Sequence, residues 1–236
     1  MGSRLVFPPC GPGVARLLTD ARAVRNPIPG PKKMPLFLQV VAWFVALAVV
    51  MSLIEHQVHC RLMHKKPRMA WIRDLKPRIK MFMSHAVEHH TQYRKEFHDE
   101  PVPHGEDRGI RLNPFEGLLE SLPLTLVLAP FTTVGAIMFP VVVCLHHMTW
   151  NLVHLEMHKP RGTFFSKSRL FKRLARHHYL HHRYPDKNFN VFLLVGDYVF
   201  GTMAKPSEAD WAEMRRQGLA PQLTGGSDGP SARVAA

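Results

Sequence analysis

Residues 34–54 read MPLFLQVVAWFVALAVVMSLI, a run of 21 residues without one Asp, Glu, Lys or Arg. As an α-helix this run would extend over roughly 30 Å, which is the thickness of the hydrocarbon core of a bilayer. A cleaved signal peptide is the competing interpretation, but the run is long for such a segment, begins late and lacks a small-residue cleavage site. Residues 34–54 therefore predict a transmembrane helix.

A second charge-free run extends from residue 121 to residue 145 and contains three prolines and a glycine. It is too short for two full crossings of a bilayer, which need about 40 residues. A single crossing would place the histidines before the run and those after it on opposite sides of the membrane. If these histidines share one site, residues 114–129 and 132–148 must form a short hairpin that dips into the membrane, turns near Pro130 and returns.

The charge balance of the chain fits a membrane surface. The 236 residues carry 31 Lys or Arg against 18 Asp or Glu, and 46% are hydrophobic, too many for a disordered basic chain. The basic segments 1–33 and 156–205 adjoin the apolar runs, as expected beside anionic lipids. No nucleic-acid-binding motif is recognisable, so we expect no nucleic-acid partner. Three widely spaced cysteines argue against a disulfide-stapled secreted domain.

These patterns divide the chain into three parts. Residues 1–33 are rich in Pro, Gly and Arg and predict a flexible basic extension. Residues 34–206 are expected to form one helical membrane domain, in which residues 164–182 have the pattern of a basic amphipathic helix. Residues 207–236 predict a short helix over 207–218 and a disordered tail. The predicted fold class is an all-α integral membrane protein with a membrane-adjacent helical part that holds a metal site.

The 16 histidines all lie between residues 56 and 182, and most of them form four short clusters. Histidines three or four residues apart share one face of an α-helix, so a cluster can direct several nitrogens at one point. Neutral imidazole is the commonest metal ligand, and ten clustered histidines exceed the needs of one ion. The sequence therefore predicts two metal ions. The clusters HCRLMH, HAVEHH, HLEMH and HYLHH contain His59, His64, His85, His89, His90, His154, His158, His178, His181 and His182.

Motifs that are absent from the sequence exclude some classes of metal site. The sequence contains no cluster of cysteines of the kind that forms a structural zinc ribbon. It also lacks the HExxH pattern of zinc peptidases and the Glu-x-x-His pattern of carboxylate diiron bundles. Imidazole-rich sites suit iron, copper or zinc. Because the clusters adjoin apolar runs, the substrate is expected to be hydrophobic. Together these features favour oxygen activation by a redox metal pair.

The order HCRLMH, HAVEHH, NLVHLEMH and HHYLHHRYPDKNFNV, followed by GDYVFGT at residues 196–202, resembles the fatty acid hydroxylase and sterol desaturase superfamily. The resemblance covers about residues 35–205. It implies a helical membrane enzyme, in a bacterial inner membrane or the endoplasmic reticulum, with a diiron centre on its cytosolic side. The ten clustered histidines would be the metal ligands. Asn151 would occupy the place of a polar residue that often lies one turn before a ligand. His56 and His177 lie close to the clusters and are candidates for supporting residues or for further ligands.

The same resemblance implies two iron ions as cofactors and dioxygen as the oxidant. The isolated protein would be able to hold zinc in place of iron. Electrons would come from a separate redox partner of the cytochrome b5 or ferredoxin type, since the HPGG haem motif of a fused cytochrome b5 is absent. The substrate would be a membrane lipid such as a fatty acyl chain, a sterol or a carotenoid. Its oxidation would give an alcohol or an alkene.

Two features depart from the usual pattern of the superfamily. One full-length apolar span is visible, whereas members usually have two transmembrane hairpins. The second cluster has the spacing HxxxHH in place of HxxHH, and in an α-helix this spacing turns His85 about 140° from His90. An α-helix therefore would not let both of these side chains face one metal.

A histidine-rich membrane protein that binds or transports metal is the competing functional class. Transporters place ionisable ligands near the bilayer midplane on several spanning helices, whereas here the histidines lie at and beyond the ends of the apolar runs.

Groups near the ligands would tune the metals. Glu55, Glu88, Glu156 and Asn151 are candidates for that role, although the carboxylates could equally be ordinary charges on helix surfaces.

Overall fold

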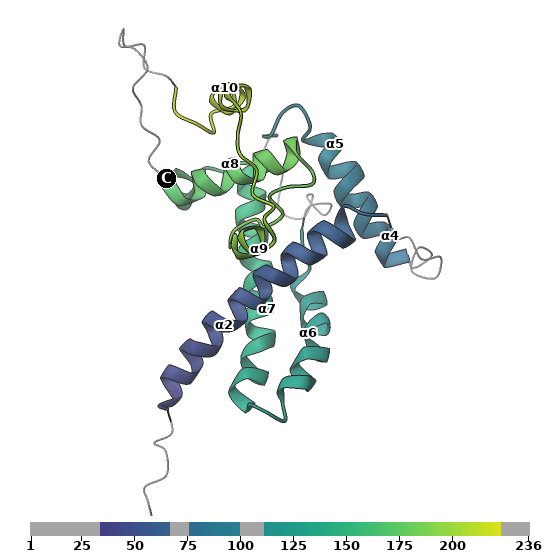
Figure 1. Cartoon of the computed structure of the whole chain (residues 1–236), viewed down its shortest axis with the longest axis vertical. Coiled ribbons are helices and arrows are strands. Elements are labelled where there is room, and N and C mark those ends of the chain that lie inside the picture. The colour runs from purple at the N-terminus through teal and green to yellow at the C-terminus, as the bar shows by residue number, and fades with distance from the viewer. Residues whose placement is uncertain (1–33, 67–75, 100–110, 223–236) are drawn as a thin grey trace, which may run out of the picture. The chain divides into compact units, whose positions relative to one another are not determined.

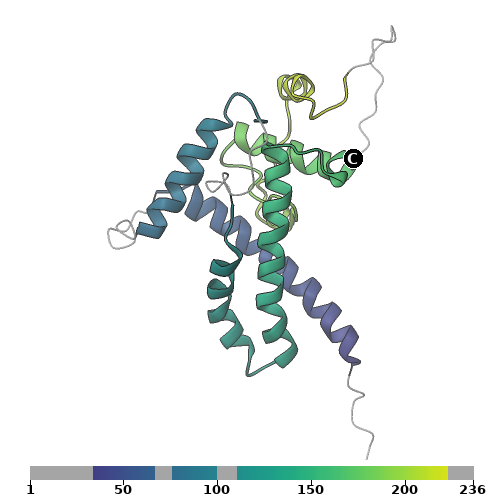
Figure 2. The same ribbon diagram turned by 180° about the vertical axis from the view of Figure 1, so that it is seen from behind.

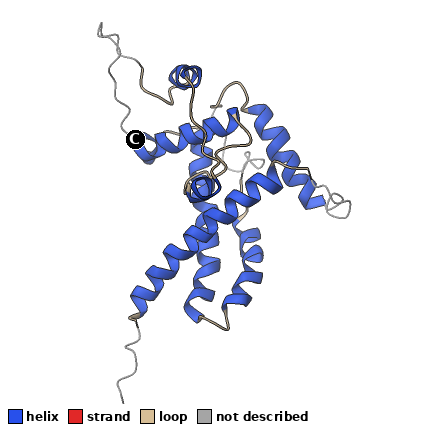
Figure 3. Cartoon of the chain, viewed as in Figure 1, coloured by secondary structure: helices blue, strands red, loops and turns tan. Residues whose placement is uncertain are grey.

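The computed structural model describes residues 34–66, 76–99 and 111–222. These residues form helices and loops and contain no β-strand (Figure 3), so the predicted all-α fold class is confirmed. The chain divides into the units Met1–Leu36 and Phe37–Ala236, and the helices from α2 onward lie in the second, apart from Leu36. The predicted basic extension and most of the predicted tail lie outside the described residues.

The first apolar run forms helix α2, Leu36–Val58, which continues into the π-helix η1, His59–Met63. Together they make a span of 28 residues whose length and composition suit a membrane crossing. The outer part of α2 is exposed, whereas one face of its inner end is buried, at Leu47, Met51, Ser52, Glu55 and His56. The helix therefore passes from an apolar exposed segment directly into the first histidine cluster.

The second apolar run forms a helical hairpin of α6, Pro114–Leu128, and α7, Thr133–His158, which lie side by side in both views (Figures 1 and 2). The side chains of Asn113 and Thr132 cap their N-termini. The predicted hairpin is thus confirmed, with its turn at residues 129–132. Its second helix was expected to end near residue 148 but continues to His158, because residues 149–158 contain no Pro or Gly. This longer helix also has the length and composition of a membrane span.

Shorter helices bring the other histidine clusters to the same place. Ser168 caps α8, and Ser207 forms a capping box with Asp210 at the start of α10. The buried face of α8 carries histidines together with Leu174, Ala175 and Leu180, so its amphipathic pattern reflects packing inside the protein. The elements are α4, Lys76–Phe82; η2, Met83–His89; α5, His90–Gln92; the 3-10 helix η4, Phe164–Lys167; α8, Arg169–Arg183; α9, Val195–Phe200; and α10, Glu208–Arg216.

The described helices pack together through two clusters of buried apolar side chains. The larger joins the end of α7 to α8, α10 and the loop around Phe97, with Met157 and Met214 fully buried in it. The smaller joins α2 to α6 and α7 around Met51 and Phe139. Many large apolar side chains on α2, α6, α7 and the turn of the hairpin remain exposed, including Phe37 at 72% and Phe131 at 83%. Exposed apolar area of this extent is typical of a surface that contacts lipid or another protein.

Helix α9 packs closely on α2 at Gly196. We therefore expect any side chain at this position to lower the stability of the protein strongly. A Cβ at this position would lie 2.5 Å from the Cβ of His56 and 2.9 Å from the carbonyl oxygen of Ser52. These atoms cannot rotate away, so we expect Gly196→Ala to lower the free energy of unfolding by about 3 kcal/mol. Thermal unfolding in detergent measures this change.

Gly201→Ala is the matched control for this prediction. No atom lies within 4 Å of the position of its Cβ, and only its positive φ of 65° opposes a side chain. The left-handed backbone conformation alone costs about 1–2 kcal/mol. Equal effects of the two substitutions would contradict the steric explanation at Gly196.

Candidate metal centre

Eight of the ten predicted histidines converge in two groups of four. Within each group the ring nitrogens that could bind a metal lie within 4.8 Å of one another. Each group draws its members from three separate segments, so neither exists before the helices pack. The first group is His59, His64, His85 and His181; the second group is His89, His158, His178 and His182.

The other two predicted histidines lie against these groups. His90 places its Nε2 3.1 Å from Nε2 of His181 in the first group, and its ring stacks at 4.4 Å on His182 in the second. The ring of His154 lies 4.7 Å from His178. The ten clustered histidines are thus brought into one assembly, buried except for the half-buried His64 and His90, in which the two groups are neighbours.

Two π-helical turns align histidines that an α-helix would separate. His59 and His64 are five residues apart, as are His85 and His90, and in an α-helix both pairs would point about 140° apart. Here the N–H of His64 bonds to the carbonyl of His59, and the N–H of His90 bonds to that of His85. Such i to i+5 bonds define the π-helix and stack residues five apart on one face. The expectation that His85 and His90 diverge is therefore wrong, because it assumed an α-helical turn.

Backbone carbonyls fix the tautomers of two histidines in the first group. Nδ1 of His59 donates to the carbonyl of Phe189, and Nδ1 of His181 donates to that of Lys187 at 2.7 Å. A carbonyl oxygen only accepts, so Nδ1 carries the proton and Nε2 of the neutral ring presents a lone pair. These Nε2 atoms face other imidazoles: His59 lies 2.7 Å from His85, and His181 lies 3.1 Å from His64. Lone pairs that converge in this way suit a shared cation.

The second group has the same construction. Nδ1 of His158 donates to the carbonyl of Phe97 at 2.9 Å, and its Nε2 lies 3.0 Å from Nε2 of His178. Both ring nitrogens of His89 are buried and hydrogen-bond to none of the described residues. Buried polar atoms rarely lack a partner. A metal ion among these rings would provide one, so the residues present fit a metal.

Burial keeps the imidazoles in the form that binds metal. It lowers the pKa of His64 to about 4 and that of His90 to about 3. Burial, reinforced by neighbouring imidazoles, also lowers the pKa values of His85, His89, His178, His181 and His182 well below the usual range. These rings are therefore neutral at pH 7, and neutral histidine is the metal-binding form.

Asp197 ties the loop of residues 187–190 to the first group. Its fully buried carboxylate accepts hydrogen bonds from the backbone N–H groups of Phe189 and Asn190, both at 2.8 Å, and from His177 at 3.0 Å. Burial alone would raise the pKa of Asp197, but hydrogen bonds from His177, Thr202 and Asn190 hold it below its usual value. The carboxylate thereby fixes the peptide whose carbonyl orients His59.

The predicted supporting residues separate into two sets. His177 donates to Asp197, and His56 donates to Thr202 Oγ1 at 2.8 Å, so both join the network behind the first group. Asn151 instead bonds to the backbone of Leu112, with both contacts at 2.7 Å. Asn151 thus links α7 to the start of the hairpin.

The three predicted carboxylates also differ in their surroundings. Glu55 accepts from the backbone N–H of Val191 and from the side chain of Asn190. Glu156 accepts from the backbone of Arg161 and Thr163, and Glu88 is exposed. Sequence reasoning did not single out Asp197, although it stands in the GDYVFGT element quoted above. No side-chain pattern marks the carbonyls of Phe97, Lys187 and Phe189.

Arg78 holds the end of the first π-helix and yields a further prediction. Its buried guanidinium donates to the carbonyls of Arg61, Leu62 and Lys65, which flank His64. An ammonium group cannot reproduce this forked geometry. We expect Arg78→Lys to lower the free energy of unfolding by about 1–2 kcal/mol and to weaken metal retention by the first group. Chemical unfolding and metal analysis of the purified protein measure the two effects.

Lys80→Ala serves as the control for Arg78→Lys. Lys80 lies on the same helix, α4, and its side chain is exposed. Surface substitutions of this kind usually change stability by less than about 0.5 kcal/mol. If Arg78→Lys behaves like Lys80→Ala, the guanidinium does not support the π-helix.

Comparison with known proteins finds a matching family. The model of the fatty acid hydroxylase family matches residues 44–202, which include all ten clustered histidines and Asp197. No curated protein and no solved structure matches the chain. This family consists of oxidoreductases of the hydroxylase type, and together with the two apolar helices the match indicates association with a membrane. Since the matched segment covers well over half of the 236 residues, the chain belongs to the fatty acid hydroxylase family.

Proposed function

We propose that this protein is an oxygen-dependent oxidoreductase that hydroxylates, or desaturates, a C–H bond of a membrane lipid at two iron ions. One observation carries the proposal: two adjacent groups of four histidines, all buried except the half-buried His64, lie beside the ends of two apolar helices. The catalytic part comprises residues 34–206. The first group would hold one ion and the second group the other, with His90 and His154 as additional ligands.

The bound irons would supply the redox chemistry, in which dioxygen, two electrons and two protons convert C–H to C–OH and water. Desaturation would consume the same reagents and yield an alkene and two waters. The electrons would come from an external cytochrome b5 or ferredoxin. The lipid would be a fatty acyl chain, a sterol or a carotenoid.

The protein's own residues contribute positioning and the exclusion of water. Carbonyls of Phe97, Lys187 and Phe189 hold three imidazoles with Nε2 directed inward. His154, His158, His178 and His181 are fully buried, so bulk water does not compete at these rings. Apolar side chains exposed on α2, α6 and α7 would contact the acyl region of the bilayer. We place the site on the cytosolic side of a bacterial inner membrane or of the endoplasmic reticulum, where a soluble electron donor can reach it.

Turnover of membrane lipids tests this function. The purified protein, loaded with iron and mixed with lipid extract, a reductase and an electron donor, should consume dioxygen and modify a lipid. Mass spectrometry with isotopically labelled dioxygen separates the two reactions: hydroxylation adds one labelled oxygen, whereas desaturation removes two hydrogens. Binding of metal without any lipid oxidation, or metal flux across vesicles, would favour a metal-binding or transport protein instead.

A further inference from the structure

Residues 93–99 form a strap over the second histidine group. The ring centroid of Tyr93 lies 4.0 Å from that of His158, and the ring of Phe97 lies 4.7 Å from it on another side. The carbonyl of Phe97 accepts the Nδ1 proton of His158. The backbone N–H of Asp99 bonds to the carbonyl of His158 at 2.7 Å. A movement of the strap would therefore move a ring of the second group.

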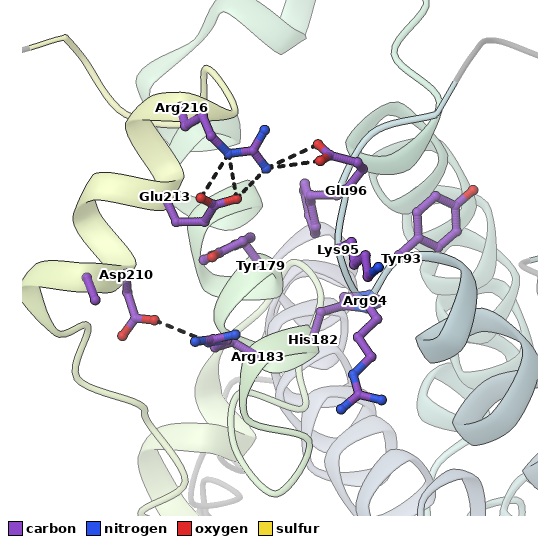
Figure 4. Close-up of a pocket in the computed structure, with 12 residues that line it drawn as sticks. Tyr93, Arg94, Lys95, Glu96, Tyr179, His182, Arg183, Asp210, Glu213 and Arg216 are labelled. Atoms are coloured by element: carbon purple, nitrogen blue, oxygen red, sulfur yellow. Dashed lines mark hydrogen bonds and ion pairs between the residues drawn. The ribbon is translucent and has the colours of Figure 1, made fainter.

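Helix α10 and the residue after it hold this strap from the outer side. The side-chain oxygen of Gln217 accepts the backbone N–H of Phe97 at 2.8 Å, and its amide nitrogen donates to the carbonyl of Lys95 at 3.2 Å. Met214 of α10 is fully buried in the same apolar cluster as Phe97. Arg216 pairs with Glu96 at 3.1 Å (Figure 4), although both side chains are exposed and such pairs contribute little. Gln217 is thus the main polar anchor of the strap on this side.

A pocket reaches the second histidine group. Its volume is about 380 Å³, and its walls are the strap, the end of α8 and α10 (Figure 4). His182 of the second group is among the residues that line it. None of the first group's histidines lines this pocket. This pocket therefore gives a chelator in solution a route to His182 of the second group.

We propose that α10 and Gln217 act as a clamp that determines how firmly the second histidine group retains its metal. This inference rests on the proposed function, since it assumes a metal in each group. Gln217 is a positioning residue: it fixes the Phe97 peptide, whose carbonyl orients His158. The first group is oriented by a different loop, which Asp197 holds. The two metals are therefore retained independently, and a segment outside the matched residues 44–202 controls one of them.

Release of iron to a chromogenic chelator tests the clamp. The full-length protein is loaded anaerobically with iron(II), and release is followed for the unmodified protein, Gln217→Met and Gln217→Asn. Methionine lacks the amide oxygen that accepts the N–H of Phe97, and asparagine is one methylene too short to reach the strap. His85→Ala and His182→Ala assign the release phases to the first and second groups. We expect both Gln217 variants to release the second group's iron about 10-fold faster and the first group's iron at an unchanged rate.

A second measurement and a matched control separate positioning from general destabilisation. Hydrogen exchange of the metal-free protein should be faster at residues 95–98 in the Gln217 variants and unchanged at residues 187–190. Gln222→Met is the control, because Gln222 is exposed and its amide bonds only to the carbonyl of Arg215 among the described residues. Unchanged release from the Gln217 variants, or equal acceleration of both irons, would overturn the clamp. Fewer than two irons in the unmodified protein would overturn the proposed function as well.

Discussion

The double substitution His181→Ala and His182→Ala is expected to remove both metals and to abolish lipid oxidation. Adjacent in sequence, the two rings belong to different groups: His181 faces His64 and His90, whereas His182 faces His178. Loss of a residue that only supports a metal ligand typically costs 10–100-fold in affinity. Loss of the ligand itself should cost at least about 100-fold at each site. Metal analysis of the purified protein and turnover of labelled dioxygen measure the two effects.

Single substitutions and a matched control sharpen this result. His181→Ala should lose the metal of the first group and His182→Ala that of the second, because each group has its own set of ligands. His147→Gln is the control: His147 lies on α7, outside both groups, and its Nδ1 faces the carbonyl of Asn113. A metal content that the double substitution leaves unchanged would show that the histidine groups do not bind metal.

Substitution of Asp197 by asparagine is expected to destabilise the protein by about 3–5 kcal/mol and to release the metal of the first group. Each carboxylate oxygen accepts two hydrogen bonds: Oδ1 from Phe189 and Thr202, Oδ2 from Asn190 and His177. In asparagine one of these oxygens becomes an NH2 group, which would face two donors. The loop of residues 187–190 would then lose its anchor, and with it the carbonyls that orient His59 and His181.

Thermal unfolding of the metal-free protein and metal analysis of the loaded protein measure the effects of Asp197→Asn. Asp186→Asn is the control, since Asp186 is exposed near the same loop. The second group should keep its metal in Asp197→Asn, because its His158 is oriented by Phe97. An unfolding temperature equal to that of the control would argue against the carboxylate as the anchor of this loop.

Patterns visible in the sequence were sufficient to predict the long apolar helices. The charge-free run of residues 34–54 predicts the helix observed as α2, and the requirement that the histidines share one side predicts the hairpin of α6 and α7. The first inference depends on local hydrophobicity, and the second combines helix-breaking residues with the assumption that the histidines share one site. The identity of the ten clustered histidines was equally visible, because each cluster is short.

The geometry of the site depended on contacts between segments. An α-helical periodicity separates His85 from His90, and only the hydrogen bond to the carbonyl of His85 shows the π-turn that aligns them. The carbonyls that fix the tautomers belong to Phe97, Lys187 and Phe189, and a backbone carbonyl leaves no signature in the identity of its residue. The sequence by itself therefore determined the apolar runs, the helices that they form and the set of candidate ligands, but neither the end of α7 nor the π-helical turns. Only the tertiary structure decided which histidines share a group and what orients them, because imidazole direction is set by hydrogen bonds between residues distant in the chain.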